Sequence, residues 1–181
     1  MADELGAPGC LAKSPVRPIL HRAGRLGVCI RWMSDADMPF LRQLYRSTRE
    51  DELEITGWEE DQKQSFIDMQ FRAQNTHYQK HYPDALWLII EQACCPVGRL
   101  YLERWTREHR IIDIALLPQV RGRGLGRAVL LDLHAEAAAD GKAVSIHVEK
   151  VNPAMSLYRR LGYETVEDKG VYDLLVWKPA G

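Results

Sequence analysis

Hydrophobic and polar positions follow two different periods along the chain, and together they predict a mixed α/β protein. Alternation with period two, or a short apolar run, predicts strands at residues 28–32, 86–90, 97–103, 111–117, 144–148, 163–167 and 171–177. Helical spacing predicts helices at residues 34–45, within 51–82, at 124–140 and at 152–162. The order is strand, helices, three strands, helix, strand, helix, two strands, which favours a single sheet flanked by helices.

The longest clearly amphipathic segment is residues 124–140. Its apolar residues recur at intervals of four, at Leu125, Val129, Leu133 and Ala137. Leu130 and Leu131 widen the apolar face, so we expect this helix to pack on the sheet rather than lie on the surface. Asp140-Gly141 is a plausible C-terminal stop.

The first 27 residues differ from the rest of the chain in composition and lack a hydrophobic period. They contain three prolines, four glycines and scattered basic groups without a period. Such a composition buries too little apolar surface to fold alone, so it predicts a mobile extension over residues 1–27 and a domain over residues 28–181.

Composition excludes several classes of protein. The net charge of −1 gives no broad attraction to nucleic acid or to a membrane surface. No apolar run approaches the ~20 residues that a membrane span needs. The four cysteines do not form a disulfide framework in a chain of this length, since two of them, Cys94 and Cys95, are adjacent. We therefore expect reduced thiols and a cytoplasmic protein with neither nucleic acid nor membrane as partner.

The most informative segment lies between the third predicted strand of the central group and the long helix. It alternates glycine and arginine: Arg121, Gly122, Arg123, Gly124, Gly126 and Arg127. A helix start has unpaired backbone N–H groups that favour an anion, and glycines let the backbone approach a phosphate closely. The segment therefore predicts a phosphate-binding loop.

Two common phosphate-binding motifs fit this loop poorly. A P-loop requires Gly-Lys-Ser/Thr, whereas Gly126 is followed by Arg127-Ala128. A dinucleotide-binding fold places Gly-x-Gly-x-x-Gly near the start of a βαβ unit. Here the spacing is Gly-x-Gly-x-Gly, and it comes two-thirds of the way along the chain.

A third motif fits. Residues 119–124, Gln-Val-Arg-Gly-Arg-Gly, match the Gln/Arg-x-x-Gly-x-Gly/Ala coenzyme A motif of the GCN5-related N-acetyltransferase (GNAT) superfamily at every defined position. Residues 152–163 are similar to the second signature of that family, Asn…Ala…Leu-Tyr…Gly-Phe/Tyr, although the spacing from Asn152 to Tyr158 is one residue shorter than the commonest form. The resemblance covers roughly residues 28–178. It implies the GNAT fold, a single mixed and mostly antiparallel sheet of six to seven strands with a central splay and about four flanking helices.

The resemblance also implies a binding site for coenzyme A. The strand before the loop would present backbone groups to the pantetheine arm at Ile114, Ala115 and Leu116. The pyrophosphate would lie on the loop and helix start, at Arg121, Gly122, Arg123, Gly124, Leu125, Gly126 and Arg127. Asn152 would contact the coenzyme, although a capping role alone would explain it about as well. Tyr158 would lie in the same site and act as the general acid that protonates the departing thiolate.

A base is also needed, because an amine attacks a thioester only as the free base. A lysine-type ammonium has a pKa of ~10.4 and an α-ammonium a pKa of ~8. Asp113 lies in the strand before the loop, and His147 lies in the strand beyond the splay, where relatives often carry Glu. Either could take the proton through water. Glu149 is a weaker third candidate.

The sequence thus predicts transfer of an acetyl group from acetyl-CoA to a primary amine of a small molecule, peptide or protein. We expect direct attack without a covalent enzyme intermediate, because the cysteines lie away from both motifs. We also expect no metal, since adjacent cysteines do not suit a metal site and the pair His77 and His81 lacks a third ligand. Transfer of a longer acyl group, acylation of a hydroxyl and coenzyme A binding without turnover are the alternatives. Residues 34–82 would shape the acceptor site but name no acceptor, and a homodimer is left open.

Overall fold

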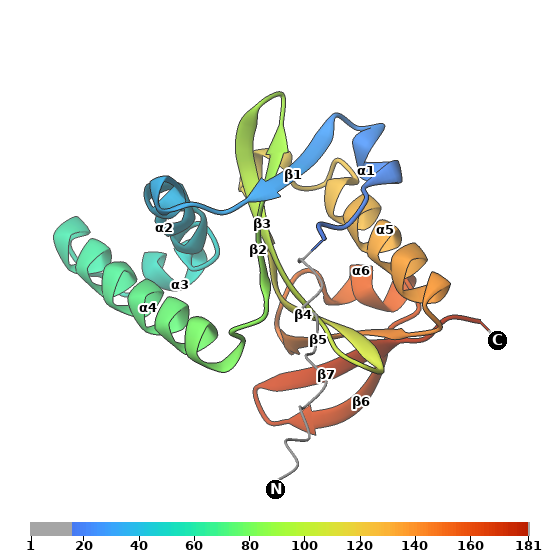
Figure 1. The fold of residues 1–181 in the computed structure, drawn as a ribbon. Helices are drawn as coiled ribbons and strands as arrows, with labels where there is room; N and C mark the ends of the chain where they lie inside the picture. The colour runs from blue at the N-terminus through green and yellow to red at the C-terminus, as the bar shows by residue number, and fades with distance from the viewer. Residues whose placement is uncertain (1–15, 181) are drawn as a thin grey trace, which may run out of the picture.

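The computed structural model describes residues 16–180, which form a seven-stranded sheet with helices on both faces (Figure 1). The strands are β1 Val28–Trp32, β2 Leu86–Gln92, β3 Cys95–Arg104, β4 Glu108–Leu116, β5 Ala143–Glu149, β6 Glu164–Lys169 and β7 Tyr172–Trp177. Their order across the sheet is β1-β2-β3-β4-β5-β7-β6. Every neighbouring pair is antiparallel except β4 and β5, which are parallel. The predicted mixed, mostly antiparallel sheet is confirmed.

The helices of the described region lie in two layers (Figure 1). Their bounds are α1 His21–Gly24, α2 Met38–Arg46, α3 Glu50–Glu54, α4 Glu60–His81, α5 Leu125–Ala139 and α6 Met155–Arg160. Helices α2, α3 and α4 cover one face of the sheet, and α1, α5 and α6 cover the other. The segment 51–82 holds two helices, α3 and α4, and α1 lies outside the predicted elements. No helix within residues 16–180 has the length and apolarity to cross a membrane.

Each helical layer has its own hydrophobic core. The larger core lies under α5 and α6, where the predicted row Leu125, Val129, Leu133 and Ala137 is buried at 0–3% exposure. The smaller core joins α2, α3 and α4 to the other face of β2 through Leu41, Tyr45, Leu53, Ile67, Phe71 and Ile89. Alternate residues of β2 therefore serve opposite cores, as period-two alternation requires.

The prediction of a mobile extension is wrong for residues 16–27. Helix α1 packs on α5, and Ala23 is fully buried. The carboxylate of Asp132, on α5, accepts hydrogen bonds from the backbone N–H of Arg22 at 2.9 Å and of Ala23 at 2.9 Å. These contacts join residues more than 100 positions apart, so local composition could not indicate them.

The predicted reduced thiols can be checked at three of the four cysteines. Cys29, Cys94 and Cys95 are free and exposed. Cys10 and the rest of residues 1–15 lie outside the described residues.

The predicted splay lies between β4 and β5. Their parallel pairing runs only from Glu108 opposite Ala143 to Ile111 opposite Ile146. Beyond this point β4 continues to Leu116 and pairs with β3 alone, while β5 continues to Glu149 and pairs with β7 alone. A bulge in the β3–β4 ladder falls at the same level, between Tyr101 and Leu102. The strands therefore diverge and leave one side of β4 without a neighbouring strand.

Gly98 lets β3 lie against the end of β4 that borders the splay. A Cβ atom at this position would lie 2.4 Å from the carbonyl oxygen of Ala115 and 2.6 Å from Cδ2 of Leu116. The first of these atoms belongs to the backbone and cannot move without moving β4. A glycine at this position therefore fixes where β4 ends relative to β3.

We expect Gly98→Ala to destabilise the fold by about 1–3 kcal/mol, because overpacking of this size shifts the backbone. Gly24→Ala is the matched control, since a Cβ atom there meets nothing within 4 Å. Its effect should stay within about 1 kcal/mol, in the stabilising direction. The measurement is the free energy of unfolding in urea, and equal values for the two variants would contradict the role given to Gly98.

Candidate active site

The start of α5 is a set of unpaired backbone donors. Gly124 is the residue before the helix, with φ +83°, and no side chain caps it within the described region. The first helical hydrogen bond runs from the N–H of Ala128 to the carbonyl of Gly124 at 2.9 Å. The N–H groups ahead of Ala128 in the first turn therefore have no intrahelical partner, and the helix dipole adds positive potential there.

Gly126 brings this first turn close to the end of β4. A Cβ atom at Gly126 would lie 3.5 Å from Cδ1 of Leu116, which is ordinary van der Waals contact. The Gln/Arg-x-x-Gly-x-Gly pattern also matches residues 121–126, two positions later than the predicted match. The later register places both motif glycines, 124 and 126, at the free donors of the helix start, so the structure favours it.

The arginines of the loop do not act as one group. The Nε of Arg121 donates to the carbonyl of Leu116 at 2.8 Å, and its Nη2 lies 3.5 Å from the carbonyl of Ser47. Burial lowers the pKa of Arg121. Arg123 and Arg127 are exposed and make no hydrogen bond to other described residues. One predicted pantetheine contact, the carbonyl of Leu116, is thus already hydrogen-bonded to Arg121.

Tyr158 lies on α6 and is buried, with 4% of its surface exposed. Its ring meets Tyr163 edge to face at 5.3 Å. Burial, and secondly the negative charge of Asp113, raise the pKa of Tyr158. Its hydroxyl therefore remains protonated at neutral pH and is close enough to Asp113, on β4, to feel that charge.

Asn152 does not cap α6 directly. Its Oδ1 accepts a hydrogen bond from the N–H of Ala154 at 2.8 Å, and the helix begins at Met155. The predicted helix start at Asn152-Pro153 is therefore early by two to three residues, because the asparagine closes a turn before the helix. The side chain of Asn152 is exposed.

Asp113 is fully engaged in an ion pair. Its Oδ1 lies 3.1 Å from Nε of Arg99, and its Oδ2 lies 2.7 Å from Nη2 of Arg99. The hydroxyl of Tyr78, on α4, donates to the same Oδ2 at 3.2 Å. Arg99 is only 3% exposed. Protonating Asp113 would leave a buried guanidinium without its counter-ion, so the geometry does not suit the predicted role of general base.

His147 is exposed on β5, and its ring is hydrogen-bonded to Arg110. Its Nδ1 lies 3.3 Å from Nη1 of Arg110, whose Nη2 donates to Glu108 at 2.9 Å. Burial, and then the charge of Arg110, lower the pKa of His147. A guanidinium has no acceptor atom, so Nδ1 must be the acceptor and the neutral ring carries its proton on Nε2. His147 therefore presents a donor to its surroundings and not a free lone pair.

Sequence reasoning missed the residues that hold these candidates, Arg99, Tyr78 and Arg110. A signal was present in β3, where Arg99 alternates with the buried Leu100 and therefore faces the layer of α2–α4. Nothing in the sequence indicated that Tyr78, 35 positions from Asp113, would reach its carboxylate.

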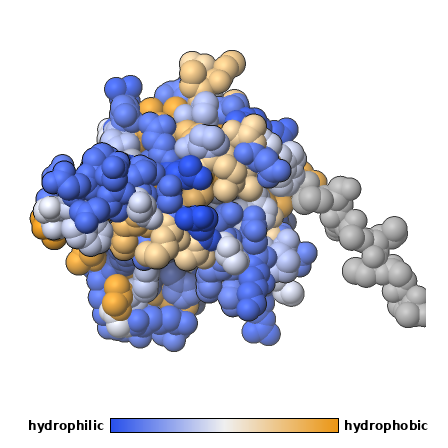
Figure 2. Space-filling model, turned by 90° about the vertical axis from the view of Figure 1, so that its left-hand side faces the viewer, coloured by the Kyte–Doolittle hydropathy of each residue, from blue (hydrophilic) through white to orange (hydrophobic). Residues whose placement is uncertain are grey.

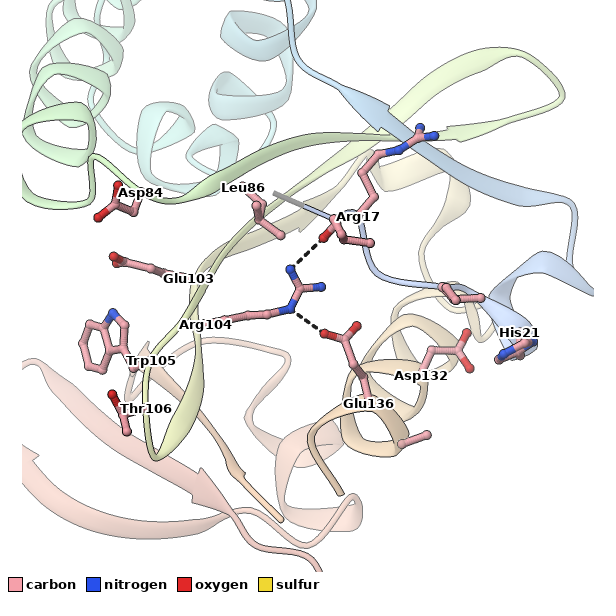
Figure 3. Close-up of a pocket in the computed structure, with 13 residues that line it drawn as sticks. Arg17, His21, Asp84, Leu86, Glu103, Arg104, Trp105, Thr106, Asp132 and Glu136 are labelled. Carbon is pink, nitrogen blue, oxygen red and sulfur yellow. Dashed lines mark hydrogen bonds and ion pairs between the residues drawn. The ribbon is translucent and has the colours of Figure 1, made fainter. Parts of the chain in front are cut away.

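A separate hollow of the described region lies away from these residues (Figure 3). It measures about 1080 Å³ and lies between residues 16–21, the β3–β4 hairpin and the second half of α5. Arg104 crosses it, donating to Glu136 at 2.6 Å and to the carbonyl of Val16 at 2.7 Å. None of the predicted site residues lines it.

Comparison with known proteins agrees with the geometry of the splay and loop. Residues 83–165 match the family model of the acetyltransferase (GNAT) domain. The matched stretch is less than half of the chain. It contains the splay, the glycine-rich loop and the helix that carries Tyr158. A search of curated protein sequences finds no match.

Solved structures extend the likeness of the GNAT domain to most of the chain. The PaiA N-acetyltransferase of Thermoplasma acidophilum, crystallised with coenzyme A, is similar with a TM-score of 0.63 and 19% identity, over 84% of this chain and 99% of that one. An acetyltransferase of Thermus thermophilus gives 0.60 and 19%, over 84% and 97%. The ribosomal-protein-S18-alanine N-acetyltransferase of Escherichia coli gives 0.54 and 19%, over 85% and 96%. At these identities the likeness shows the fold.

We expect Gly126→Ala to weaken the binding of coenzyme A by about tenfold or more, because its methyl group would lie between the helix start and Leu116, where the pyrophosphate and the pantetheine arm are predicted to meet. Gly126 is the sharper test than Gly124, where any side chain is strained by the positive φ. Alanine is the better helix former, so thermal stability should be kept or raised. Titration calorimetry with coenzyme A gives the affinity. Unchanged affinity in the folded variant would argue against an anion at this helix start.

Proposed function

We propose that the protein transfers the acetyl group of acetyl-CoA to a primary amine by direct attack. The observation that carries this proposal is the meeting of three features at one place. Strand β4 loses its neighbour on the β5 side after Ile111, the uncapped start of α5 adjoins the end of β4, and the buried Tyr158 belongs to the hydrophobic core against which Ile114 and Leu116 of β4 pack. The crystallised complex of the Thermoplasma relative with coenzyme A supports the same ligand here.

The residues at this place fit coenzyme A by their chemistry. The free N–H groups of the first turn of α5, from Gly124 to Arg127, would bind the pyrophosphate. Exposed Arg123 and Arg127 add positive charge. Residue 122 in the loop has a φ of +71°, a backbone conformation that favours glycine. The unpaired side of β4 at Ile114, Ala115 and Leu116 would hold the pantetheine arm as an added strand. Acetyl-CoA supplies an activated thioester, and the chain supplies position and protons.

Tyr158 is the proposed general acid. Burial keeps its hydroxyl protonated, so it can donate a hydrogen bond, and then a proton, to negative charge that develops on the departing sulfur. A hydroxyl kept neutral in this way favours catalysis over coenzyme A binding alone. Asn152 would contact the coenzyme from its exposed position before α6.

The acceptor would approach from the side of α2, α3 and α4. Figure 2 shows this face, where hydrophilic residues predominate and apolar residues are scattered between them. Asp113 is proposed to position this side of the site through Arg99 and Tyr78 rather than to act as the base. A cytoplasmic location and a homodimer stay predictions.

Transfer to an amine is tested by following thiol release from acetyl-CoA in the presence of lysine amide, an alanyl peptide amide and 1,4-diaminobutane. Acetyl-amide products, identified by mass, would support the proposal. Tight binding of coenzyme A without product from any amine would instead identify a binding module. Propionyl-CoA and acceptors that carry only hydroxyl groups serve as controls for the donor and for the attacking atom.

Replacing Tyr158 with phenylalanine removes only the hydroxyl, and the ring contacts with Tyr163 remain. We expect kcat to fall by about 10²–10⁴-fold, the range usual for a general acid. Affinity for coenzyme A should change little, because backbone groups hold it. Single-turnover kinetics and titration calorimetry measure the two quantities. A kcat within about threefold of wild type would show that Tyr158 is not the acid, and lost coenzyme binding would make it a positioning residue.

A further inference from the structure

A small polar cluster joins the end of β5 to the helical layer. Glu149 is the last residue of β5, beyond the point where β4 and β5 separate. Arg49, from the turn between α2 and α3, donates to Oε1 of Glu149 at 3.2 Å. Tyr172, on β7, donates to the same oxygen at 3.2 Å. The cluster therefore lies beside the splay on the face from which an acceptor would arrive.

The two carboxylate oxygens of Glu149 differ in their partners. Both donors bond to Oε1, and Oε2 has no hydrogen-bond partner among the described residues. About a quarter of the side chain is exposed, so Oε2 can be reached by a ligand. Arg49 and Tyr172 thus fix the direction of the carboxylate and leave one oxygen available. This is the arrangement in which a carboxylate can accept a proton at a defined place.

The turn that carries Arg49 spans the splay. At one side Arg121, in the loop after β4, has its Nη2 3.5 Å from the carbonyl of Ser47. At the other side Arg49 reaches Glu149 on β5. The turn 47–49 therefore contacts both the loop after β4 and the end of β5. Glu149 lies at the edge of the opening between them.

The other two candidates for the base are engaged. Asp113 has Arg99 on both oxygens, and the Nδ1 of His147 accepts from Arg110. Glu149 lies two residues after His147 and therefore on the same face of β5. Of the three residues, Glu149 is the one with an acceptor atom, Oε2, that has no hydrogen-bond partner among the described residues.

We propose that Glu149 binds the ammonium group of the acceptor through Oε2 and takes its first proton. This proposal rests on the proposed function.

Oε2 of Glu149 takes one proton from the ammonium and later releases it to solvent. The neutral amine nitrogen forms the new bond to the carbonyl carbon, and the bond from that carbon to sulfur breaks. Tyr158 gives a proton to sulfur and regains, through water, the second proton that nitrogen loses as the amide forms. One proton is released to solvent for each amide made.

A pH profile separates this role from a structural one. If Glu149 deprotonates a bound ammonium, the charged amine is the true substrate, and kcat/KM should stay level from about pH 6.5 up to the pKa of the acceptor. In Glu149→Gln the amine must arrive as free base, so kcat/KM should rise about tenfold per pH unit over that range. At pH 7 we expect the variant to be about 10²-fold or more slower than wild type. Glutamine keeps an acceptor for Arg49 and Tyr172, so the fold should be retained.

Two matched variants serve as controls. His147→Gln should keep the level profile, because His147 presents a donor. Glu167→Gln removes another exposed carboxylate, on β6, and should leave both rate and profile unchanged. Acetyl-CoA with 1,4-diaminobutane, lysine amide and the alanyl peptide amide are the substrates for every variant, and thermal melting reports folding.

The outcomes distinguish this assignment from the proposed function. A level profile and near-normal rate in Glu149→Gln, with Tyr158→Phe still slow, would overturn the role of Glu149 and leave the acetyltransferase assignment standing. A sloped profile in His147→Gln and not in Glu149→Gln would transfer the role to His147. Absence of turnover by the wild-type protein with all three amines, beside intact binding of coenzyme A, would overturn both.

Discussion

The separation of β4 from β5 after Ile111 and Ile146 is the constraint on which the rest of the site depends. A parallel pair that continued would satisfy the backbone of both strands and leave no place for a ligand. Because it stops, the outer half of β4 is a sheet edge inside the domain. The loop after β4 then brings the unpaired donors of α5 to the end of that edge. One interrupted ladder thus creates an unpaired strand edge and places beside it a helix start with free N–H donors.

Arginines engage the polar side chains that lie near the splay. Arg99, Arg110 and Arg49 each hold one polar side chain near the splay, respectively Asp113, His147 and Glu149. Since a guanidinium is always charged and only donates, each contact decides what its partner can still do. Both oxygens of Asp113 and the Nδ1 lone pair of His147 accept hydrogen bonds from arginine, whereas Oε2 of Glu149 has no partner among the described residues. The proposed roles of these three residues therefore follow from which atoms the arginines leave free.

The sequence predicted what depends on local pattern. The sheet, the helix 125–139 and the loop at Gly122–Gly126 all followed from periodicity, glycine spacing and the family signatures. The engagement of Asp113 by Tyr78 and that of His147 by Arg110 depend on which residues the sheet register and helix packing bring together, and no local pattern encodes that. The same holds for α1, a single turn whose stability comes from tertiary contact. The motif register was ambiguous for a simpler reason, because the pattern fits twice.

The carboxylate of Asp132 bears on where the domain can be cut. The boundary that composition suggests, Val28, would remove the N–H groups of Arg22 and Ala23 that this carboxylate binds. It would leave on α5 an anionic side chain, 1% exposed in the folded protein, with its partners gone. It would also uncover the site on α5 that Ala23 fills. A shortened version that starts at Val28 would therefore expose an unpaired carboxylate on the helix whose other end is the proposed phosphate site, whereas one that starts at Val16 would keep this part of the helix covered.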